Sequence, residues 1–221
     1  MTDGRWFIVD FDSTLVRVEA LDVLAAMLVR GNPARAADAT AVAEITERAM
    51  AGELDFTEAL EARLAILRPR REDVAALVEL LREELTPSAL EQRAFLGTPA
   101  VYVMSGGFRE WVEPVVAGLG VPAERVLANT LVFETAGEAT GFDRANPLSR
   151  SGGKAAAVRA LALRGEVIVV GDGWTDYEVR AAGAADRFYA FVENVERPRV
   201  VERADRVAAS FTDLLAQEGL L

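Results

Sequence analysis

Apolar runs rich in β-branched and aromatic residues predict the buried strands of this chain. Four such runs cover residues 6–9 (WFIV), 100–104 (AVYVM), 166–170 (EVIVV) and 187–192 (RFYAFV). Runs of this length and composition are typical of strands that are covered on both faces. Weaker patterns predict a strand over 126–133, a hairpin over 135–142 and a short strand over 206–209.

The segments between these strands have the spacing of apolar residues that is typical of helices. Four helices, over 18–29, 34–51, 57–67 and 71–85, follow the first strand without interruption. Later helices, over 87–96, 108–119, 154–163, 175–182 and 212–217, alternate with strands. This alternation predicts an α/β protein with a Rossmann-like core and a central parallel sheet. The first helices predict a small cap domain over 16–82, inserted after the first strand of a core domain made of 1–15 and 83–221.

The composition indicates a globular chain with a strongly acidic balance. Of its 221 residues 51% are hydrophobic, and the formal net charge is −11. This charge argues against nucleic acid or an anionic membrane as a partner. No apolar segment approaches the roughly 20 residues of a membrane helix, and no signal peptide is visible. We therefore expect a cytoplasmic protein, and the sequence leaves open whether it is a monomer or a homodimer.

The residue types that are absent restrict the possible chemistry. The chain has no Cys and no His. Thiolate nucleophiles, zinc sites built from Cys or His, and Ser-His-Asp triads are therefore excluded. Catalysis must use carboxylates, hydroxyls, Arg, Lys or a metal with oxygen ligands, which favours Mg²⁺. Lys154 is the single Lys among 24 basic residues, which suggests a site that needs the compact charge of an ammonium rather than the planar guanidinium of Arg.

Polar residues follow three of the predicted strands directly. Asp10 and Asp12 come after the first, Ser105-Gly106-Gly107 after the second, and Asp172 and Asp176 after the third. In a parallel sheet these strand ends share one edge, so we expect the residues to converge. Each group alone also has a structural explanation in a turn, a helix N-cap or, for Thr175 and Glu178, a capping box. Four Asp at one edge, however, would repel one another without a cation.

Lys154 adds the feature that favours phosphate chemistry. It opens a predicted helix after two glycines, where the helix dipole disfavours a positive charge. The placement is reasonable if an anion binds there. Carboxylates, a bound Mg²⁺, a hydroxyl beside glycine N–H groups and one Lys together indicate phosphoryl transfer. Without His, the available mechanism is attack by a carboxylate that forms an aspartyl-phosphate.

The motifs DFDST, SGGF, SGGK and GDGWTD resemble the four motifs of the haloacid dehalogenase superfamily, and among its members the phosphoserine phosphatases. The resemblance covers nearly the full chain. It implies that Asp10 is the nucleophile and that Asp12 first protonates the leaving oxygen and then activates water. It also implies that Mg²⁺ is held by the Asp10 carboxylate, the Asp12 backbone carbonyl and Asp172, with support from Asp176.

The same resemblance implies a substrate, O-phospho-L-serine, whose hydrolysis is the last step of serine biosynthesis. The phosphate would be held by Ser105, Gly106, Gly107, Lys154 and Thr175. The residues Glu19, Met50, Phe56 and Arg63 match positions of the substrate pocket in the resembling enzymes. Arg63 falls within the apolar stripe of its predicted helix, where snorkelling is the usual explanation. The functional interpretation is that Arg63 binds the serine carboxylate and Glu19 the ammonium.

Three other interpretations remain open. A nucleotide-binding protein is disfavoured because SGGKA lacks the P-loop pattern and GDGWTD is one residue short of GxGxxG. A phosphatase or phosphotransferase of the same superfamily could act on another small phosphorylated metabolite, such as phosphohomoserine. A non-catalytic binder of phosphorylated ligands is the third, although every catalytic motif position is filled.

Overall fold

The computed structural model describes residues 4–50 and 53–221, without the side chain of Met50. A six-stranded parallel sheet forms its centre, in the order β3-β2-β1-β6-β7-β8. The strands are β1 (Arg5–Val9), β2 (Val101–Phe108), β3 (Val126–Asn129), β6 (Glu166–Gly171), β7 (Arg187–Phe191) and β8 (Arg206–Ala208). The predicted α/β class with a central parallel sheet is confirmed.

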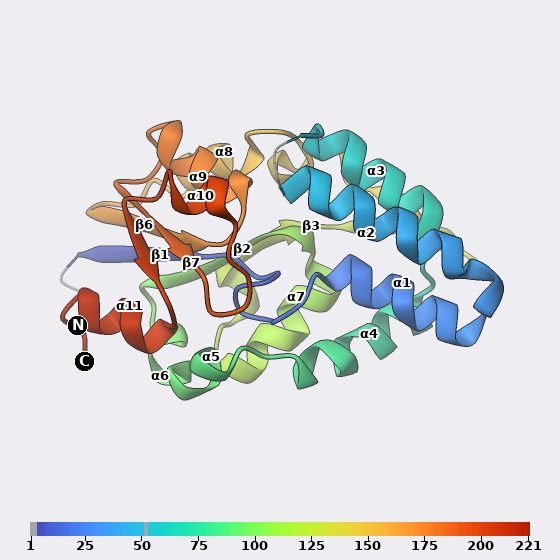
Figure 1. Ribbon diagram of the computed structural model, residues 1–221, viewed down its shortest axis with the longest axis horizontal. Coiled ribbons are helices and arrows are strands. Elements are labelled where there is room, and N and C mark those ends of the chain that lie inside the picture. Colours follow the sequence, from blue (N-terminus) through green and yellow to red (C-terminus); the bar gives the residue numbers. More distant parts are fainter. Residues whose placement is uncertain (1–3, 51–52) are drawn as a thin grey trace.

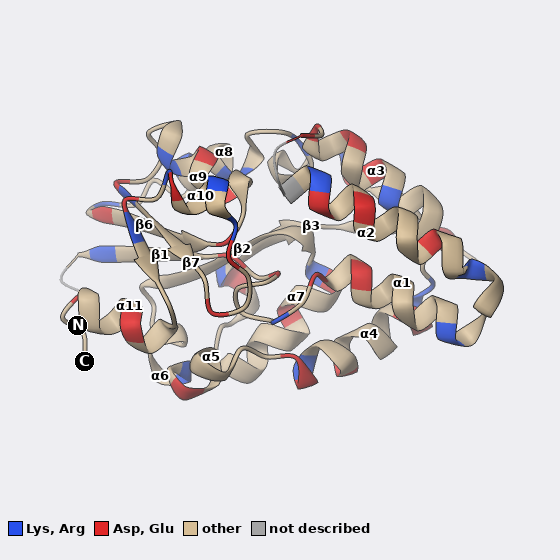
Figure 2. Ribbon diagram, in the orientation of Figure 1, with Lys and Arg blue, Asp and Glu red and all other residues tan. Residues whose placement is uncertain are grey.

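Alternate residues of the central strand β1 enter different cores. Phe7 and Val9 point into the core that includes the helices between β1 and β2, whereas Ile8 packs with Val158 and Val179 on the other face. Successive side chains of a strand point to opposite faces, so a strand covered on both sides must be apolar throughout. The strands of this sheet carry charge only at the first position of β1, β6, β7 and β8, while the other acidic and basic residues mark the helices and loops (Figure 2).

The helices cover both faces of the sheet (Figure 1). One group follows β1 directly, with α1 (Ala20–Gly31), α2 (Ala36–Met50), α3 (Phe56–Leu67) and α4 (Arg71–Glu83). The others are α5 (Pro87–Glu91), α6 (Arg93–Leu96), α7 (Arg109–Val116), α8 (Gly153–Ala160), α9 (Trp174–Ala181), α10 (Pro198–Val201) and α11 (Phe211–Gln217). In the part of the chain that the structure describes, no helix has the length and apolar character to cross a membrane.

The group α1–α4 extends to one side of the sheet (Figure 1). The chain enters and leaves it through two adjacent segments. The N–H of Thr86 donates to the carbonyl oxygen of Leu15 at 2.9 Å, and the Thr86 hydroxyl donates to that of Thr14 at 2.7 Å. Short paired connections of this kind fix where an inserted group of helices begins and ends. The division into a core and a cap domain over 16–82 stays a prediction.

Three predicted elements differ from the structure. The strand predicted over 126–133 ends at Asn129, because the Asn129 amide donates to the carbonyl oxygens of Gly106 and Leu148 and the chain then turns. The following residues form β4 (Leu131–Phe133), which pairs antiparallel with β5 (Ala139–Phe142), so the hairpin predicted over 135–142 begins earlier, at Leu131. The helix predicted over 87–96 breaks at Gln92 into α5 and α6.

The third difference concerns the edge of the sheet where polar residues gather. The strand predicted to end at residue 104 continues as β2 through Ser105, Gly106 and Gly107 to Phe108, with a shift of register against β3. Ser105 is therefore a strand residue and not the N-cap of α7, which is Phe108.

Candidate active site

Residues from the ends of β1 and β2 and from the helix that follows β6 line one small cavity of about 30 Å³. Its lining residues come from the loop after β1, from β2, and from the helices α1, α3, α7, α8 and α9. They are Asp10, Asp12, Glu19, Ala20, Leu21, Phe56, Arg63, Gly106, Gly107, Trp111, Lys154 and Thr175. Ser105 also lies 3.4 Å from Asp12, and carboxylate oxygens of Asp10, Asp172 and Asp176 lie within 4.8 Å of one another, so the three strand ends converge as the parallel sheet predicted.

Lys154 lies in the first turn of α8 and joins two carboxylates. Its Nζ is 2.7 Å from Oδ1 of Asp10 and 2.7 Å from Oδ1 of Asp176, and all three side chains are buried. Burial lowers the pKa of the ammonium, but the two carboxylates raise it more, so the pKa of Lys154 lies above its ordinary value. Lys154 is therefore a permanent positive charge in this cavity.

Asp176 approaches the backbone at the end of β6 because Gly171 has no side chain. A Cβ at Gly171 would collide with the Asp176 carboxyl group. Oδ2 of Asp176 also accepts a hydrogen bond from the N–H of Gly173 at 3.1 Å and so caps α9. The capping box considered for Thr175 and Glu178 is thus wrong, and Thr175 instead faces the cavity.

Asp10, Asp172 and Asp176 form a buried cluster that fits a hard cation. One carboxylate oxygen of each lies within 4.8 Å of the others, and all the donors are oxygen. Around them, five carboxylates (Asp10, Asp12, Glu19, Asp172, Asp176) face three cations (Arg63, Lys154, Arg197). Fully ionised, the site would keep at least two negative charges unbalanced, which a divalent cation would neutralise.

Asp12 points toward β2 instead of joining this cluster. Its Oδ1 accepts from the N–H of Ala20 at 2.7 Å, and Oδ2 lies 3.4 Å from the Ser105 hydroxyl. The Ser105 oxygen in turn accepts from the N–H of Gly107 at 2.8 Å, which fixes its orientation. Burial and the nearby charge of Asp10 raise the pKa of Asp12 to about 7, against the lowering effect of the Ala20 N–H. Asp12 can therefore hold or release a proton near neutral pH.

Glu19 and Arg63 bring an acidic and a basic group to the same cavity. Arg63 is only 4% exposed, in agreement with its predicted place within the apolar stripe of α3. Glu19 accepts a hydrogen bond from the Ser13 hydroxyl at 2.7 Å. Burial and the charge of Asp12 raise the pKa of Glu19 to about 8. A ligand with both a cationic and an anionic group would complement this pair.

Phe56, at the start of α3, closes the cavity over β2. A Cβ at Gly106 would lie 2.7 Å from the Phe56 ring, so the glycine permits this contact. The remaining predicted pocket residue, Met50, has its side chain outside the described part of the chain.

Two residues that sequence reasoning missed also belong to the site. Arg197 follows β7 and places Nε 2.9 Å from Asp172 and Nη2 3.5 Å from Glu19. The end of β7 lies at the same edge as the other strand ends, so the sequence could have placed this segment near the site, although it could not have predicted the contacts of Arg197. Trp111 has a fully buried indole whose N–H finds no hydrogen-bond partner in the described chain, and its sequence pattern gave no signal beyond that of a core residue.

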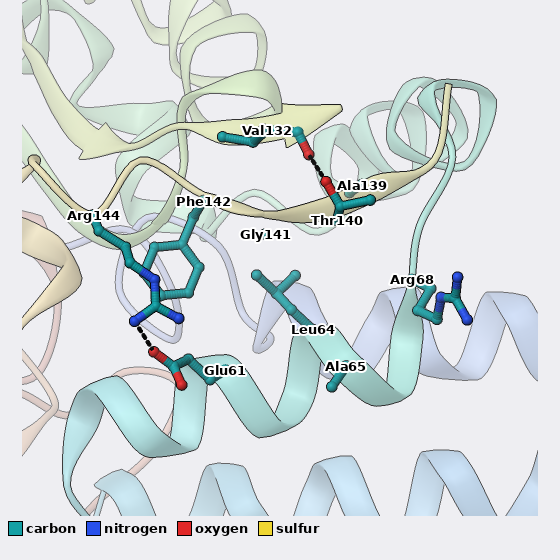
Figure 3. A pocket seen from close by; sticks show the side chains of 10 residues that line it. All are labelled: Glu61, Leu64, Ala65, Arg68, Val132, Ala139, Thr140, Gly141, Phe142 and Arg144. Carbon is teal, nitrogen blue, oxygen red and sulfur yellow. Dashed lines mark hydrogen bonds and ion pairs between the residues drawn. The ribbon is translucent and has the colours of Figure 1, made fainter. Parts of the chain in front are cut away.

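A second hollow lies outside this site, between α3 and the hairpin β4–β5 (Figure 3). It has a volume of about 640 Å³ and is bordered by Leu64, Val132 and Phe142, with Arg144 ion-paired to Glu61 at 2.9 Å. None of the strand-end carboxylates borders it. The contacts around it hold α3 against the hairpin.

The raised carboxyl pKa values predict how stability depends on pH when no metal is bound. Asp12 and Asp172 have pKa values of about 7, and Glu19 and Asp176 of about 8. Because these values exceed those of the unfolded chain, near 4, their contribution favours the folded state at low pH and is lost between about pH 4 and pH 8. We expect the unfolding free energy of EDTA-treated protein to fall by about 2 kcal/mol or more between pH 5.5 and 8.

Urea unfolding at several pH values measures this effect. Divalent cations should restore more stability at pH 8 than at pH 5.5, because they bind the deprotonated carboxylates. Asp172→Asn removes one of the titrating groups and should make the fall smaller. Constant or rising stability of the wild-type protein over this range would contradict the prediction.

Comparison with known proteins agrees with this geometry. The family model of the haloacid dehalogenase-like hydrolases matches residues 7–181. The chain is 38% identical over 213 residues to phosphoserine phosphatase of Homo sapiens, covering 94% of this chain and 90% of the human protein. A phosphoserine phosphohydrolase-like protein from Francisella tularensis matches the structure with a TM-score of 0.87 at 29% identity, covering 96% of this chain and 99% of that one. A phosphoserine phosphatase solved as a phospho-aspartyl intermediate analogue matches with a TM-score of 0.75 at 26% identity, covering 96% and 97%.

Proposed function

We propose that this chain, which belongs to the haloacid dehalogenase-like hydrolase family, hydrolyses O-phospho-L-serine to L-serine and phosphate. The match of the family model confirms the family that the four motifs resemble. The observation that carries the choice of substrate is the pair of half-buried Glu19 and buried Arg63 in the same cavity as Asp10 and Lys154. Phosphoserine has an ammonium, a carboxylate and a phosphate, and the cavity offers a partner of opposite charge for each.

In the first step, a carboxylate oxygen of Asp10 attacks the phosphorus atom and the bond from phosphorus to the serine oxygen breaks. Asp12 gives its proton to that oxygen, so L-serine leaves as a neutral hydroxyl compound. Its pKa of about 7 keeps a substantial protonated fraction available for this transfer at neutral pH. The product of the step is an aspartyl-phosphate on Asp10.

In the second step, the Asp12 carboxylate takes a proton from water as the water oxygen attacks phosphorus. The bond between phosphorus and Asp10 breaks, phosphate is released, and Asp12 is protonated again. One residue therefore serves as acid and then as base. The intermediate pKa of Asp12 suits both roles better than the ordinary value near 4 would.

Positive charge for the phosphate comes from two sources. Mg²⁺ would be held by the carboxylates of Asp10, Asp172 and Asp176 with the Asp12 backbone carbonyl, and would supply a fixed divalent charge to the phosphate oxygens. Lys154 supplies the other charge from the start of α8. Ser105, the Gly106 backbone and Thr175 complete the phosphate site, while Gly107 supports it by orienting the Ser105 hydroxyl.

The helices α1–α4 act in this proposal as a cap that carries substrate selectivity. Phe56 and Arg63 both belong to α3, and Glu19 immediately precedes α1. The catalytic carboxylates and Lys154 belong to the sheet side of the cavity. Closing the cap over the sheet therefore assembles the selective and the reactive halves of the site and shields the phosphoryl group from bulk water during the first step.

The test is a comparison of kcat/KM on phosphoserine, phosphothreonine, phosphohomoserine, a sugar phosphate and an aryl phosphate, with Mg²⁺, for the wild type and Arg63→Ala. We expect phosphoserine to be preferred by the wild type. In Arg63→Ala, phosphoserine hydrolysis should fall about 10- to 100-fold, as expected for the loss of a charged hydrogen bond. Aryl phosphate hydrolysis should change little, because that substrate has no carboxylate.

Arg82→Ala is the matched control, since Arg82 lies on α4, is exposed and pairs with Glu79. It should leave both rates unchanged. Equal losses on phosphoserine and aryl phosphate in Arg63→Ala would refute the carboxylate-binding role. A wild-type preference for the sugar phosphate would refute the proposed substrate.

A further inference from the structure

A polar cluster lies where the helices α1, α2 and α3 meet. At its centre is Thr46 of α2, whose side chain is completely buried. The Thr46 hydroxyl hydrogen can reach Oδ1 of Asp22, on α1, at 2.8 Å or the carbonyl oxygen of Val42 at 3.0 Å. The shorter contact is to the carboxylate, which is also the stronger acceptor. Thr46 and Asp22 therefore form a hydrogen-bonded pair between two helices.

This pair continues to Arg63 on α3. The Nη1 group of Arg63 donates to the Thr46 oxygen at 3.4 Å, and Nε donates to the carbonyl oxygen of Ala59 at 3.2 Å. For the third nitrogen, Nη2, no hydrogen bond to another described residue is present, and Arg63 lines the active-site cavity. The guanidinium is thus held from the helix side at two nitrogens and left available for a ligand at the third.

We propose that Thr46, oriented by Asp22, is a positioning residue that fixes the Arg63 guanidinium and thereby sets the length of substrate that the site accepts. This inference rests on the proposed phosphoserine activity. Lys154 is fixed between Asp10 and Asp176 at the phosphate end. With both cations fixed, the separation between a substrate's phosphate and its carboxylate has one favoured value.

A substrate with one more methylene group, such as phosphohomoserine, must shift one of its charged groups from its partner. A guanidinium that is free to change rotamer would follow the carboxylate and accept both lengths. The Arg side chain has several rotatable bonds. Arg63 can therefore discriminate between substrates of different length only if other contacts immobilise its guanidinium. Thr46 makes the contact nearest the end of this side chain.

The α2 helix contains a matched control for the threonine substitution. Thr40 also has its hydroxyl near the carbonyl oxygen four residues earlier, with Thr40 Oγ1 at 3.4 Å from Ala36, but Thr40 is exposed and contacts no group of the site. Thr40→Val and Thr46→Val therefore remove the same group from the same helix. Only Thr46→Val removes the contact to Asp22 and Arg63.

The experiment measures kcat/KM on phosphoserine, phosphohomoserine and an aryl phosphate, with melting temperatures recorded alongside. In Thr46→Val we expect the preference for phosphoserine over phosphohomoserine, as a ratio of kcat/KM values, to fall about tenfold. This lies within the range of discrimination that a pocket achieves for one methylene group. The aryl phosphate rate should stay unchanged. Thr46→Ser, which keeps the hydroxyl, should restore the preference, and Thr40→Val should keep it.

Asp22→Asn gives a second variant if Thr46→Val does not fold. It keeps an acceptor for the Thr46 hydroxyl but weakens the bond, so the preference should fall by less than in Thr46→Val. An unchanged preference in the folded Thr46 or Asp22 variants would overturn this proposal alone, provided that the wild type prefers phosphoserine. A wild type that does not hydrolyse phosphoserine would overturn the proposed function and this inference with it.

Discussion

Asp10→Asn is expected to abolish turnover of every phosphomonoester while leaving the fold intact. The amide has nearly the shape of the carboxylate but cannot act as the nucleophile, so kcat should fall on the order of 10⁴-fold or more. The fold should tolerate the change because Lys154 keeps its 2.7 Å contact to Asp176. The variant should show unchanged circular dichroism and a cooperative unfolding transition.

Acid quenching with ³²P-labelled substrate tests the same substitution at the level of the intermediate. The wild type should retain covalent label and Asp10→Asn should retain none. Asp143→Asn is the control, since Asp143 is exposed and its side chain accepts a hydrogen bond from the nearby N–H of Ala145, far from the site residues. Substantial Mg²⁺-dependent turnover by Asp10→Asn would show that Asp10 is not the nucleophile.

The central part of the fold and of the site follows from local rules of sequence. Asp10 and Asp172 come directly after β1 and β6, whose apolar composition reflects burial on both faces. Parallel strands place such residues at one edge whatever the loops between them do. Lys154 could be predicted for a related reason, because a cation at the start of a helix requires a compensating anion.

Other features depend on tertiary contacts that have no local pattern. Arg197 reaches Asp172 and Glu19 from an irregular segment, and only the path of that segment after β7 brings it there. The early end of β3 depends on the Asn129 amide, which bonds to the backbone of two distant segments. Thr46 has an ordinary sequence context, and its position beside Arg63 follows from the packing of three helices. The spacing of apolar residues along the chain predicts helices and strands, but it does not predict which side chains of separate elements will touch.

Lys154→Ala is expected to damage both activity and stability. Loss of a positioned charge at the phosphate should lower kcat/KM on the order of 10³-fold. The substitution also leaves the buried carboxylates of Asp10 and Asp176 without their shared cation. Breaking a buried ion pair by removing one partner costs about 3–5 kcal/mol, so the metal-free variant should unfold at markedly lower urea concentration at pH 8. At pH 5.5 the loss should be smaller, since burial raises the pKa of Asp176 to about 8 and its carboxyl group is then neutral.

Lys154→Arg tests whether the site needs only a positive charge at this position or specifically the compact ammonium group of Lys. The ammonium lies between two carboxylates in a space where the side chain is 8% exposed. A planar guanidinium is larger and directs its donors in one plane, so it cannot reproduce both 2.7 Å contacts there. We expect this variant to recover much of the stability but to remain at least about 100-fold below the wild type in kcat/KM. Arg159→Ala, an exposed cation lost from the same helix, should be neutral in both measurements. Full activity of Lys154→Arg would show that any cation suffices, and the retention of one Lys among 24 basic residues would then have no catalytic reason.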